Sequence, residues 1–352
     1  MQFSVVESWD ELPASAVSLL EDYGRDHPFQ GAMWFSLFSR YVAWGLGEPR
    51  WLLLQDGQTV HTVLPMLHTT QSRTRILNSM GNYYTPYFDV ISRDASPAHG
   101  LSQLLMMGAD FLARHDIINL SPLVGPVRDR FEHALQDIGF HIQTYHCSSN
   151  WREREITDFD RYWSQVNGRT RHTVERKLKK LQQAGDYLFS IAGVDEIERA
   201  LLDYHEVYFK SWKVNEPFPA FIDELARQAA RQNLVRLGLL HHAGRPVAAQ
   251  LWFVAAGTAY IFKLAYDPAY HRQSVGSLLS HYLFREIIAR DKVHTIDYLT
   301  GNDAYKADWM SETRELFGLQ CANRRSLRGF GHMTSSMVRT AARLAVGRHS
   351  AH

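Results

Sequence analysis

Hydrophobic and polar residues alternate along residues 50–68, and the alternation is interrupted at Asp56 and Gly57. Two β-rich runs joined by Asp-Gly predict a β-hairpin. Residues 76–91 are rich in β-branched and aromatic side chains, and they predict a strand, a loop and a second strand. From residue 97 the hydrophobic spacing becomes helical and stays so to residue 114. The pattern then predicts a strand at 116–120, a helix at 127–138 and a strand at 140–147.

The same order of elements returns in the second half of the chain. A hairpin is predicted at 235–242 and 246–254, a strand at 258–266, an amphipathic helix at 277–290 and a strand at 294–299. Because both halves give hairpin, strand, loop, helix and strand at comparable spacing, we expect a duplicated α+β unit. Two unrelated α/β domains are the alternative. Helices outside the repeat are predicted at 169–184, 195–212 and 219–232.

Composition narrows the class of protein. The 352 residues are 45% hydrophobic and 21% charged, which is typical of a folded chain of about two domains. Lys and Arg number 38 and Asp and Glu 37, so no strong net charge favours DNA binding. The two cysteines lie far apart, which argues against a disulfide framework or a cysteine-based zinc site. With no signal-like N-terminus and no apolar run of spanning length, we expect a cytoplasmic protein without a transmembrane segment.

The segment that joins the strand at 258–266 to the following helix carries the most specific signal. A loop placed directly before a helix leaves the first backbone N–H groups of that helix without intrahelical acceptors, and such a start can bind phosphate. Gly276 would allow close approach of an anion. An ordinary capped helix is the alternative. The residues expected at this loop are Arg272, Gln273, Ser274, Val275, Gly276 and Ser277.

The run from Gln273 to Leu278, Q-S-V-G-S-L, resembles the coenzyme A pyrophosphate signature R/Q-x-x-G-x-G/A of GNAT acyltransferases, with Leu278 in place of the last small residue. The longer segment 266–309 resembles the FemABX-like and cellulose-biosynthesis acetyltransferase group, through its Y-D-P-x-Y, S-x-G-x-L-L and D-Y-L-x-G-x-x-x-Y-K runs. The resemblance implies two tandem GNAT-like domains with mixed central sheets flanked by helices. We expect an acceptor-side domain at 1–155, a donor domain at 156–330 and a basic, helix-forming tail at 331–352.

The resemblance implies transfer of an acyl group, acetyl first among the candidates, from acyl-coenzyme A to an amine of a small molecule, an amino sugar or a peptide. An aminoacyl-tRNA donor is the alternative within the family, and the basic helix at 169–184 is its local support, although a solvated helix face is the simpler interpretation. A non-catalytic GNAT-fold protein of envelope polysaccharide synthesis is a third hypothesis. Metal is not expected, because no H-x-x-x-H or H-E-x-x-H motif occurs.

Roles for individual residues follow from the same resemblance. A bulged strand would offer a backbone N–H near Leu264, Ala265 and Tyr266 to the thioester carbonyl. Asp297 is the first candidate for the base and Asp303 the second; an ion pair of Asp297 with a lysine such as Lys306 is the structural alternative. Tyr305 or Tyr266 would serve as the acid, and Lys306 would bind a substrate carboxylate or phosphate.

Acceptor contacts are expected from two further segments. The aromatic loop at 81–89 predicts a sugar- or peptide-binding cleft, and a hydrophobic plug between the two halves is the alternative. Trp212 and the neighbouring Lys213 lie in a segment that resembles the acceptor-side loop of the family. The residues expected to contact the acceptor are Tyr83, Tyr84, Tyr87, Asp89, Trp212 and Lys306.

Overall fold

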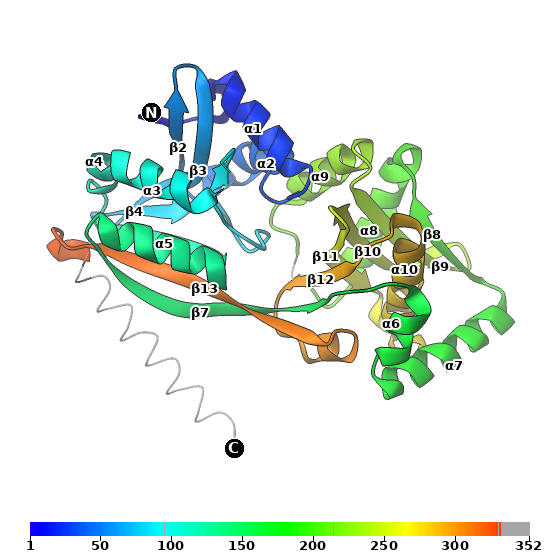
Figure 1. The fold of residues 1–352 in the computed structure, drawn as a ribbon. Helices are drawn as coiled ribbons and strands as arrows, with labels where there is room; N and C mark the ends of the chain where they lie inside the picture. The colour runs from blue at the N-terminus through cyan, green and yellow to red at the C-terminus, as the bar shows by residue number, and fades with distance from the viewer. Residues whose placement is uncertain (95, 214, 330, 332–352) are drawn as a thin grey trace. The chain divides into compact units, whose positions relative to one another are not determined.

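The computed structural model of the chain describes residues 1–94, 96–213, 215–329 and 331. These fold into two compact units. The first unit comprises residues 1–23, 38–147 and the described residues from 315 onward; the second unit comprises residues 24–37 and 148–314. The chain therefore passes from one unit to the other and back (Figure 1).

A short N-terminal segment, residues 24–37, belongs to the second unit because it carries two large aromatic side chains. The centroid of the Phe29 ring lies 5.3 Å from that of Phe253. Trp34 is fully buried and meets Phe221 edge-on at 5.2 Å. Burial of aromatic side chains of this size is strongly favourable, so the segment is anchored where these rings are covered.

The predicted division into 1–155 and 156–330 differs from these units. Besides residues 24–37, the strand that ends the described fold returns to the first unit, where Leu316 to Ala322 pair with Val124 to Ile117. Hydrophobic periodicity shows which face of an element is apolar, but it does not show which sheet or helix covers that face. Apart from Gly331, the predicted basic tail lies outside the described residues.

The first unit is built on an α+β plan. Its helices and strands, including those that cross into or out of it, are β1 (Gln2–Val6), α1 (Ala14–Gly24), α2 (Ala32–Tyr41), β2 (Glu48–Asp56), β3 (Thr59–Gln71), β4 (Thr74–Ser79), β5 (Ile91–Ser92), α3 (Pro97–Met107), α4 (Ala109–Leu112), β6 (Ile117–Val124), α5 (Gly125–Asp137), β7 (Phe140–Glu153) and β13 (Glu312–Asn323).

The sheet of the first unit has the order β1-β2-β3-β4-β6-β13. All its neighbouring strands are antiparallel except β4 and β6, which run parallel. Helices α3 and α5 cover one face of this sheet, where Leu101, Leu104 and Phe131 are buried (Figure 1). The apolar faces of α3 and α5 thus close the core on this side of the sheet.

The second unit repeats this plan. Its elements are α6 (Phe159–Gln165), α7 (Gly168–Ala184), β8 (Tyr187–Ala192), α8 (Ile197–Lys210), α9 (Pro219–Arg231), β9 (Val235–His242), β10 (Arg245–Ala255), β11 (Thr258–Tyr266), the 3-10 helix η4 (Pro268–Gln273), α10 (Val275–Asp291), β12 (Thr295–Thr300) and the 3-10 helix η5 (Ala304–Asp308).

The sheet of the second unit has the order β12-β11-β10-β9-β8, and only β11 and β12 run parallel. The end of β7 pairs with the outer edge of β12. Successive residues of β10 face opposite layers. Trp252 packs against Phe284 of α10, whereas Phe253 packs against Phe29. Helix α10 therefore packs on one face of the sheet, and the segment with Phe29 and Trp34 packs on the other.

The duplicated α+β fold predicted from the sequence is confirmed. In each unit two antiparallel hairpin strands and a third strand are followed by a helix that returns to a parallel fourth strand, β2-β3-β4-α3-β6 and β9-β10-β11-α10-β12. The sequence did not predict β8, β13, α1, α2 or α6. The segment between β11 and α10, expected as a loop, contains η4.

We predict that Gly238→Ala destabilises the second unit. Gly238 lies on β9, and a Cβ there would come within 2.6 Å of the Leu283 Cδ2 atom and 2.9 Å of its Cγ. Leu283 is fully buried and cannot move aside freely. Overpacking of this kind typically lowers the free energy of unfolding by about 1–3 kcal/mol, which urea denaturation would measure.

Gly168→Ala is the matched control, because a Cβ at Gly168 meets no atom within 4 Å. It should leave the free energy of unfolding unchanged or slightly higher. Equal stability of Gly238→Ala and the wild type would contradict the packing described for β9 and α10.

Candidate active site

The central feature of the second unit is the separation of β11 from β12. The two strands pair only over Thr258–Tyr260 and Thr295–Asp297. Beyond Tyr260, β11 continues for residues 261–266, and no described strand pairs with that edge. Backbone groups on the open edge are therefore available to a ligand.

A β-bulge lies where the two strands part. Trp252 of β10 is opposite Ile261, but Leu251 is opposite Lys263, so Phe262 is the extra residue on β11. A bulge twists the strand and re-aims the groups that follow it. Leu264, Ala265 and Tyr266, the predicted carbonyl-binding residues, lie on the open stretch directly after this bulge.

Helix α10 begins beside the open end of β11. Its N-cap residue, Ser274, has left-handed backbone angles and makes no side-chain capping bond. The first N–H groups of α10 have no intrahelical acceptor, which is the arrangement that binds anions. A Cβ on Gly276 would lie 3.0 Å from Tyr266 Cδ1, so glycine allows this close approach of helix and strand.

A buried polar network holds the first turn of α10 against β10. Gln250 Nε2 donates to the Gly276 carbonyl at 3.1 Å and to Ser280 Oγ at 2.8 Å. Trp252 Nε1 donates to Gln250 Oε1 at 2.9 Å. Because the network engages a carbonyl of this turn, it fixes the turn without using its N–H groups.

Lys177 of the basic helix α7 reaches the same loop. Its ammonium donates to the Arg272 carbonyl and, at 2.7 Å, to Ser274 Oγ. Burial, with the positive charges of Arg176 and Lys180, lowers the pKa of Lys177. The loop thus receives a positive charge from a helix that lies about 100 residues earlier in the chain.

Asp297 on β12 is buried and engaged through both carboxylate oxygens. Oδ1 accepts from Asn150 Nδ2 at 2.5 Å and from the Leu299 backbone N–H at 2.7 Å; Oδ2 accepts from Arg314 at 3.1 Å. Arg314 also donates to Asn150 Oδ1. Leu299 has a positive φ of 55°, which non-glycine residues adopt only with strain, and the bond from its N–H stabilises this turn.

A cluster of three lysines and two carboxylates lies on β11 and on the segments near it. Its members are Lys213, Lys263, Lys306, Glu216 and Asp303. Lys306, 4% exposed, donates to the Thr300 and Gly301 carbonyls and pairs with Asp303 at 3.3 Å. Lys263 pairs with Glu216 at 2.8 Å between buried side chains. The charges of these lysines also act on Lys213, which completes the group.

Lys213 has the most altered pKa of the three. Burial, followed by the positive charges of Lys263 and Lys306, lowers its pKa to about 8, while the Asp303 carboxylate opposes the shift. Burial also lowers the pKa of Lys306 and of Lys263, against the effect of their carboxylate partners. The excess of positive charge over the two carboxylates suits an anionic group.

Comparison with known proteins agrees with this geometry. Residues 168–307 match the family model described as Acetyltransferase (GNAT) domain. The matched residues lie within the second unit. No curated protein sequence matches the chain.

Solved structures share the fold of the chain at low sequence identity. FemX superposes with a TM-score of 0.62 at 10% identity, over 91% of this chain and 97% of FemX. L-PGS from Bacillus licheniformis gives 0.58 at 12% identity, over 96% and 98%. The C-terminal domain of a putative lysylphosphatidylglycerol synthetase from Agrobacterium fabrum gives 0.56 at 10%, over 93% and 97%. The chain therefore shares the fold of these proteins.

Some of the predicted site residues lie at the end of β11, whereas Asp297 lies where β12 still pairs with Tyr260 of β11. Trp212 stacks on Tyr266 with ring centroids 4.6 Å apart, and the Tyr266 hydroxyl bonds His271 Nδ1 at 3.2 Å. Tyr305 meets Tyr298 edge-on, and burial followed by the Asp303 charge raises the pKa of Tyr305.

The predicted acceptor residues of the aromatic loop belong to the first unit and differ in accessibility. Tyr83 is 60% exposed, whereas Tyr84 is 3% exposed and part of the core. Tyr87 is half-buried. Asp89 pairs with Arg130 at 2.7 Å. Direct contact with an acceptor therefore suits Tyr83 better than Tyr84 or Asp89.

Sequence reasoning assigned no donor-loop role to Lys177 and did not single out Lys263. The basic helix that carries Lys177 predicts either a tRNA-binding face or a solvated face, and neither alternative places Lys177 at the donor loop. Lys263 left a signal, because it is a charged residue within the largely apolar run of β11. A lysine in such a position requires a partner, which is Glu216.

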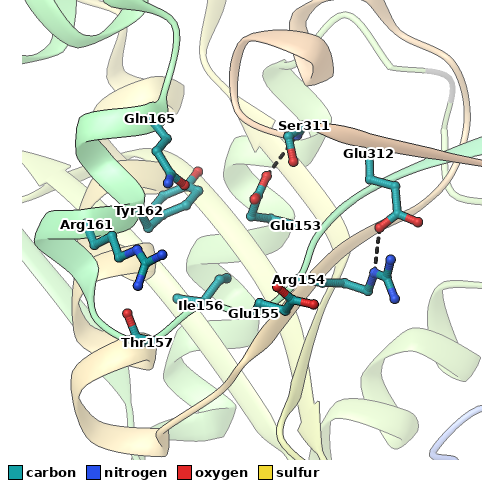
Figure 2. A pocket seen from close by; sticks show the side chains of 10 residues that line it. All are labelled: Glu153, Arg154, Glu155, Ile156, Thr157, Arg161, Tyr162, Gln165, Ser311 and Glu312. Carbon is teal, nitrogen blue, oxygen red and sulfur yellow. Dashed lines mark hydrogen bonds and ion pairs between the residues drawn. The ribbon is translucent and has the colours of Figure 1, made fainter.

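Figure 2 shows a cavity of about 300 Å³ in the second unit, whose lining includes no residue of the donor loop or of β11. Its wall is polar, and two of the lining carboxylates accept hydrogen bonds from other lining residues. Glu153 accepts from the Ser311 N–H at 2.8 Å, and Arg154 donates to Glu312 at 2.5 Å (Figure 2). None of its lining residues is among those that converge on the end of β11.

Other features of the described residues bear on the class of site. No described group of three or more His, Cys, Asp and Glu side chains has the arrangement of a metal site. Among the described helices, none combines the length and the apolarity that crossing a bilayer requires.

We predict that Asp297→Asn mainly destabilises the protein. It removes the charge that holds Arg314 and disturbs the bonds to Asn150 and Leu299. Breaking a fully buried pair costs about 3–5 kcal/mol; with the Arg314 side chain 24% exposed, we expect about 2 kcal/mol of lost unfolding free energy. Thermal and urea denaturation would measure it.

Asp303→Asn is the matched variant, because the same chemical change is made on a side chain that is 62% exposed. Its loss of stability should be smaller than that of Asp297→Asn, because Lys306 keeps its bonds to the Thr300 and Gly301 carbonyls. Turnover of the two variants separates the roles. A stable Asp297→Asn protein with turnover reduced by about 10² to 10⁴ would instead make Asp297 the base.

Proposed function

We propose that the second unit is an N-acyltransferase that moves an acyl group, acetyl in the first instance, from coenzyme A to an amine. The observation that carries this proposal is the start of α10 beside the unpaired edge of β11, within a matched GNAT domain. The start of α10 can accommodate phosphates, and the unpaired edge of β11 can accommodate a carbonyl oxygen. Their proximity is what an acyl-coenzyme A thioester requires.

The phosphates would lie at the first turn of α10. Val275, Gly276 and Ser277 would offer backbone N–H groups there, with Arg272 and Gln273 in the preceding η4. The Lys177 ammonium at the Ser274 hydroxyl adds positive charge to this loop. The Gln250 network supports the same turn, so little ordering is needed on binding.

The thioester carbonyl would lie along the open edge of β11. When the amine attacks, the carbonyl oxygen becomes negative, and a backbone N–H near Leu264, Ala265 or Tyr266 would stabilise it. A C–N bond forms, the C–S bond breaks, one proton leaves the amine and one is taken up by the departing thiolate. Tyr266 or Tyr305 would supply the proton to the thiolate.

We assign Asp303 as the general base that accepts the proton from the amine. Both oxygens of Asp297 already accept hydrogen bonds, whereas Asp303 is exposed and, among the described residues, forms an ion pair with Lys306. A general base must reach the proton it removes, and an accessible carboxylate at the end of β12 meets that condition. Lys306 and Lys213 would hold an anionic group of a small-molecule, amino-sugar or peptide acceptor.

We predict that Ser277→Asp weakens coenzyme A binding without destabilising the fold. A carboxylate in the first turn of α10 interacts favourably with the helix dipole, but it repels phosphates. Affinity should fall at least about tenfold, or 1.4 kcal/mol, in calorimetric titration with coenzyme A. Gly276→Asp should act in the same direction, with added crowding against Tyr266.

Ser311→Asp is the control, because it introduces the same charge on an exposed residue outside the donor loop. Unchanged coenzyme A affinity in a folded Ser277→Asp protein would move the donor site elsewhere. Failure of the wild type to bind coenzyme A or aminoacyl-tRNA would favour the non-catalytic alternative.

An aminoacyl-tRNA donor is the second candidate, and the exposed face of α7 supports it. Arg176, Lys179 and Lys180 are exposed, and no described acidic side chain forms an ion pair with them. Lys177, in contrast, is engaged at the donor loop. The face available to RNA is therefore formed by the neighbours of Lys177.

If tRNA is the donor, Lys179→Ala combined with Lys180→Ala should reduce the salt dependence of tRNA binding. Each lost phosphate contact lowers the slope of log affinity against log salt by about 0.7 to 0.9, which filter binding across a salt series would measure. Lys292→Ala is the control on another surface. Absence of tRNA binding at low salt would remove this candidate.

A further inference from the structure

The turn that follows α8 places a lysine beside the open end of β11. The Trp212 ring is 56% exposed and stacks on Tyr266, with ring centroids 4.6 Å apart. Ser211 Oγ donates to the Tyr208 carbonyl at 2.7 Å and accepts from the Lys213 N–H at 3.3 Å. These contacts hold the Lys213 backbone next to the part of β11 along which the thioester carbonyl would lie.

The side chain of Lys213 lies among the charged groups near the ends of β11 and β12. The charges of Lys263, Lys306 and Asp303 all act on its ammonium. Lys263 belongs to the open stretch of β11, Lys306 belongs to η5, and Asp303 is the N-cap residue of η5. Because η5 follows β12, the ammonium is close both to the open stretch of β11 and to the loop after β12.

Ion pairing distinguishes Lys213 from the two neighbouring lysines. Lys263 pairs with Glu216 at 2.8 Å. Lys306 pairs with Asp303 at 3.3 Å and also donates to two backbone carbonyls. In the part of the chain that the structure describes, no carboxylate lies within 4.0 Å of the Lys213 ammonium, and no group accepts a hydrogen bond from it. Lys213 is therefore the lysine of this cluster whose Nζ is available for reaction.

The surroundings of Lys213 also favour its neutral amine. Burial and the positive charges of Lys263 and Lys306 lower its pKa to about 8, against the effect of the Asp303 charge. At pH 8 about half of the side chain is then an uncharged amine, compared with less than about 1% for a lysine of ordinary pKa. Only the uncharged amine has the lone pair that attacks a carbonyl, so Lys213 combines an available position with the reactive form.

We propose that Lys213 is itself an acyl acceptor, whose Nζ takes the acyl group from the thioester at the donor site when no other amine is present. The inference deepens the proposed function and rests on it, because acyl-coenzyme A supplies the acyl group. A bond forms between Nζ and the acyl carbon, and the C–S bond breaks. Nζ loses one proton, and the departing thiolate takes up one. The products are an acylated lysine side chain and free coenzyme A.

Self-acylation of Lys213 changes the charge at the acceptor side of the site. It replaces the ammonium with a neutral amide, while Lys263 and Lys306 keep their carboxylate partners. An anionic acceptor held by Lys213 and Lys306 would then bind less tightly, because one positive charge is lost. Conversely, a bound anion would stabilise the Lys213 ammonium and protect it from acylation.

Incubation of the full chain with acetyl-coenzyme A and no added acceptor tests the proposal. Intact-mass spectrometry should show the addition of an acetyl group, and peptide mapping should place it on Lys213. The rate should saturate with acetyl-coenzyme A. It should also level off above about pH 8, where Lys213 is mostly neutral. Acetylation of an ordinary surface lysine would instead continue to rise to about pH 10.

Variants and a competitor show whether the acyl group comes from the donor site. Lys213→Arg keeps the positive charge, but its guanidinium stays protonated and does not attack the thioester, so the addition should be lost. Lys292→Arg, the same change on an exposed residue at the end of α10, should be acetylated on Lys213 at the wild-type rate. Ser277→Asp should lower the rate at least about tenfold at low acetyl-coenzyme A. Excess desulfo-coenzyme A, which occupies the donor site without a thioester, should stop the addition.

Calorimetric titration with coenzyme A separates failure of this inference from failure of the proposed function. Coenzyme A binding without acetylation of Lys213 would overturn self-acylation alone. Addition spread over surface lysines, or addition unaffected by desulfo-coenzyme A, would do the same. Absence of coenzyme A binding by the wild type would overturn both. The mapping and the competition use the wild type, so they decide the question even if Lys213→Arg does not fold.

Discussion

The parting of β11 and β12 is the constraint on which the second unit depends. Two adjacent parallel strands normally continue their ladder, but here pairing stops at Tyr260 and Asp297. Where β12 turns away from β11, its backbone N–H and carbonyl groups need other hydrogen-bond partners. Asp297 is one of them, accepting from the Leu299 N–H, while Asn150 donates to the Leu299 carbonyl. The buried carboxylate thus maintains the opening.

The residues that support the end of β11 and β12 differ from the groups that remain available to a ligand. The buried charge of Asp297 is compensated by Arg314 and Asn150, as a carboxylate in a dry environment requires. Hydrogen-bond donors remain at the backbone N–H groups at the start of α10 and on the open edge of β11. Partly accessible side chains lie on the loop that follows β12. Rigid, fully bonded supports beneath open backbone donors are the arrangement expected of a preorganised site.

The two units share a fold but differ in the residues at their strand ends. In the second unit the helix that follows the third strand of the repeat begins next to Gly276, and the Lys177 ammonium bonds the Ser274 hydroxyl there. In the first unit the equivalent helix begins with Ser96 and Pro97, and the parallel strands pair at Asn78 and Asn119. The hydrogen-bonded framework is shared, whereas the charge and polarity at the strand ends differ between the units.

Local patterns in the sequence determined the elements and their duplication. The period of two in β9 to β11, the Asp-Gly turn before β3 and the helical spacing of α10 depend on near neighbours in the chain, and so does the loop around Gly276. The outcome for Asp297 could not be read locally, because its partner Asn150 lies 147 positions away. The same holds for Lys177, which reaches Ser274, and for residues 24–37, which join the second unit. Whether a buried charge is paired, and which core covers an aromatic ring, depends on contacts that exist only once the chain has folded.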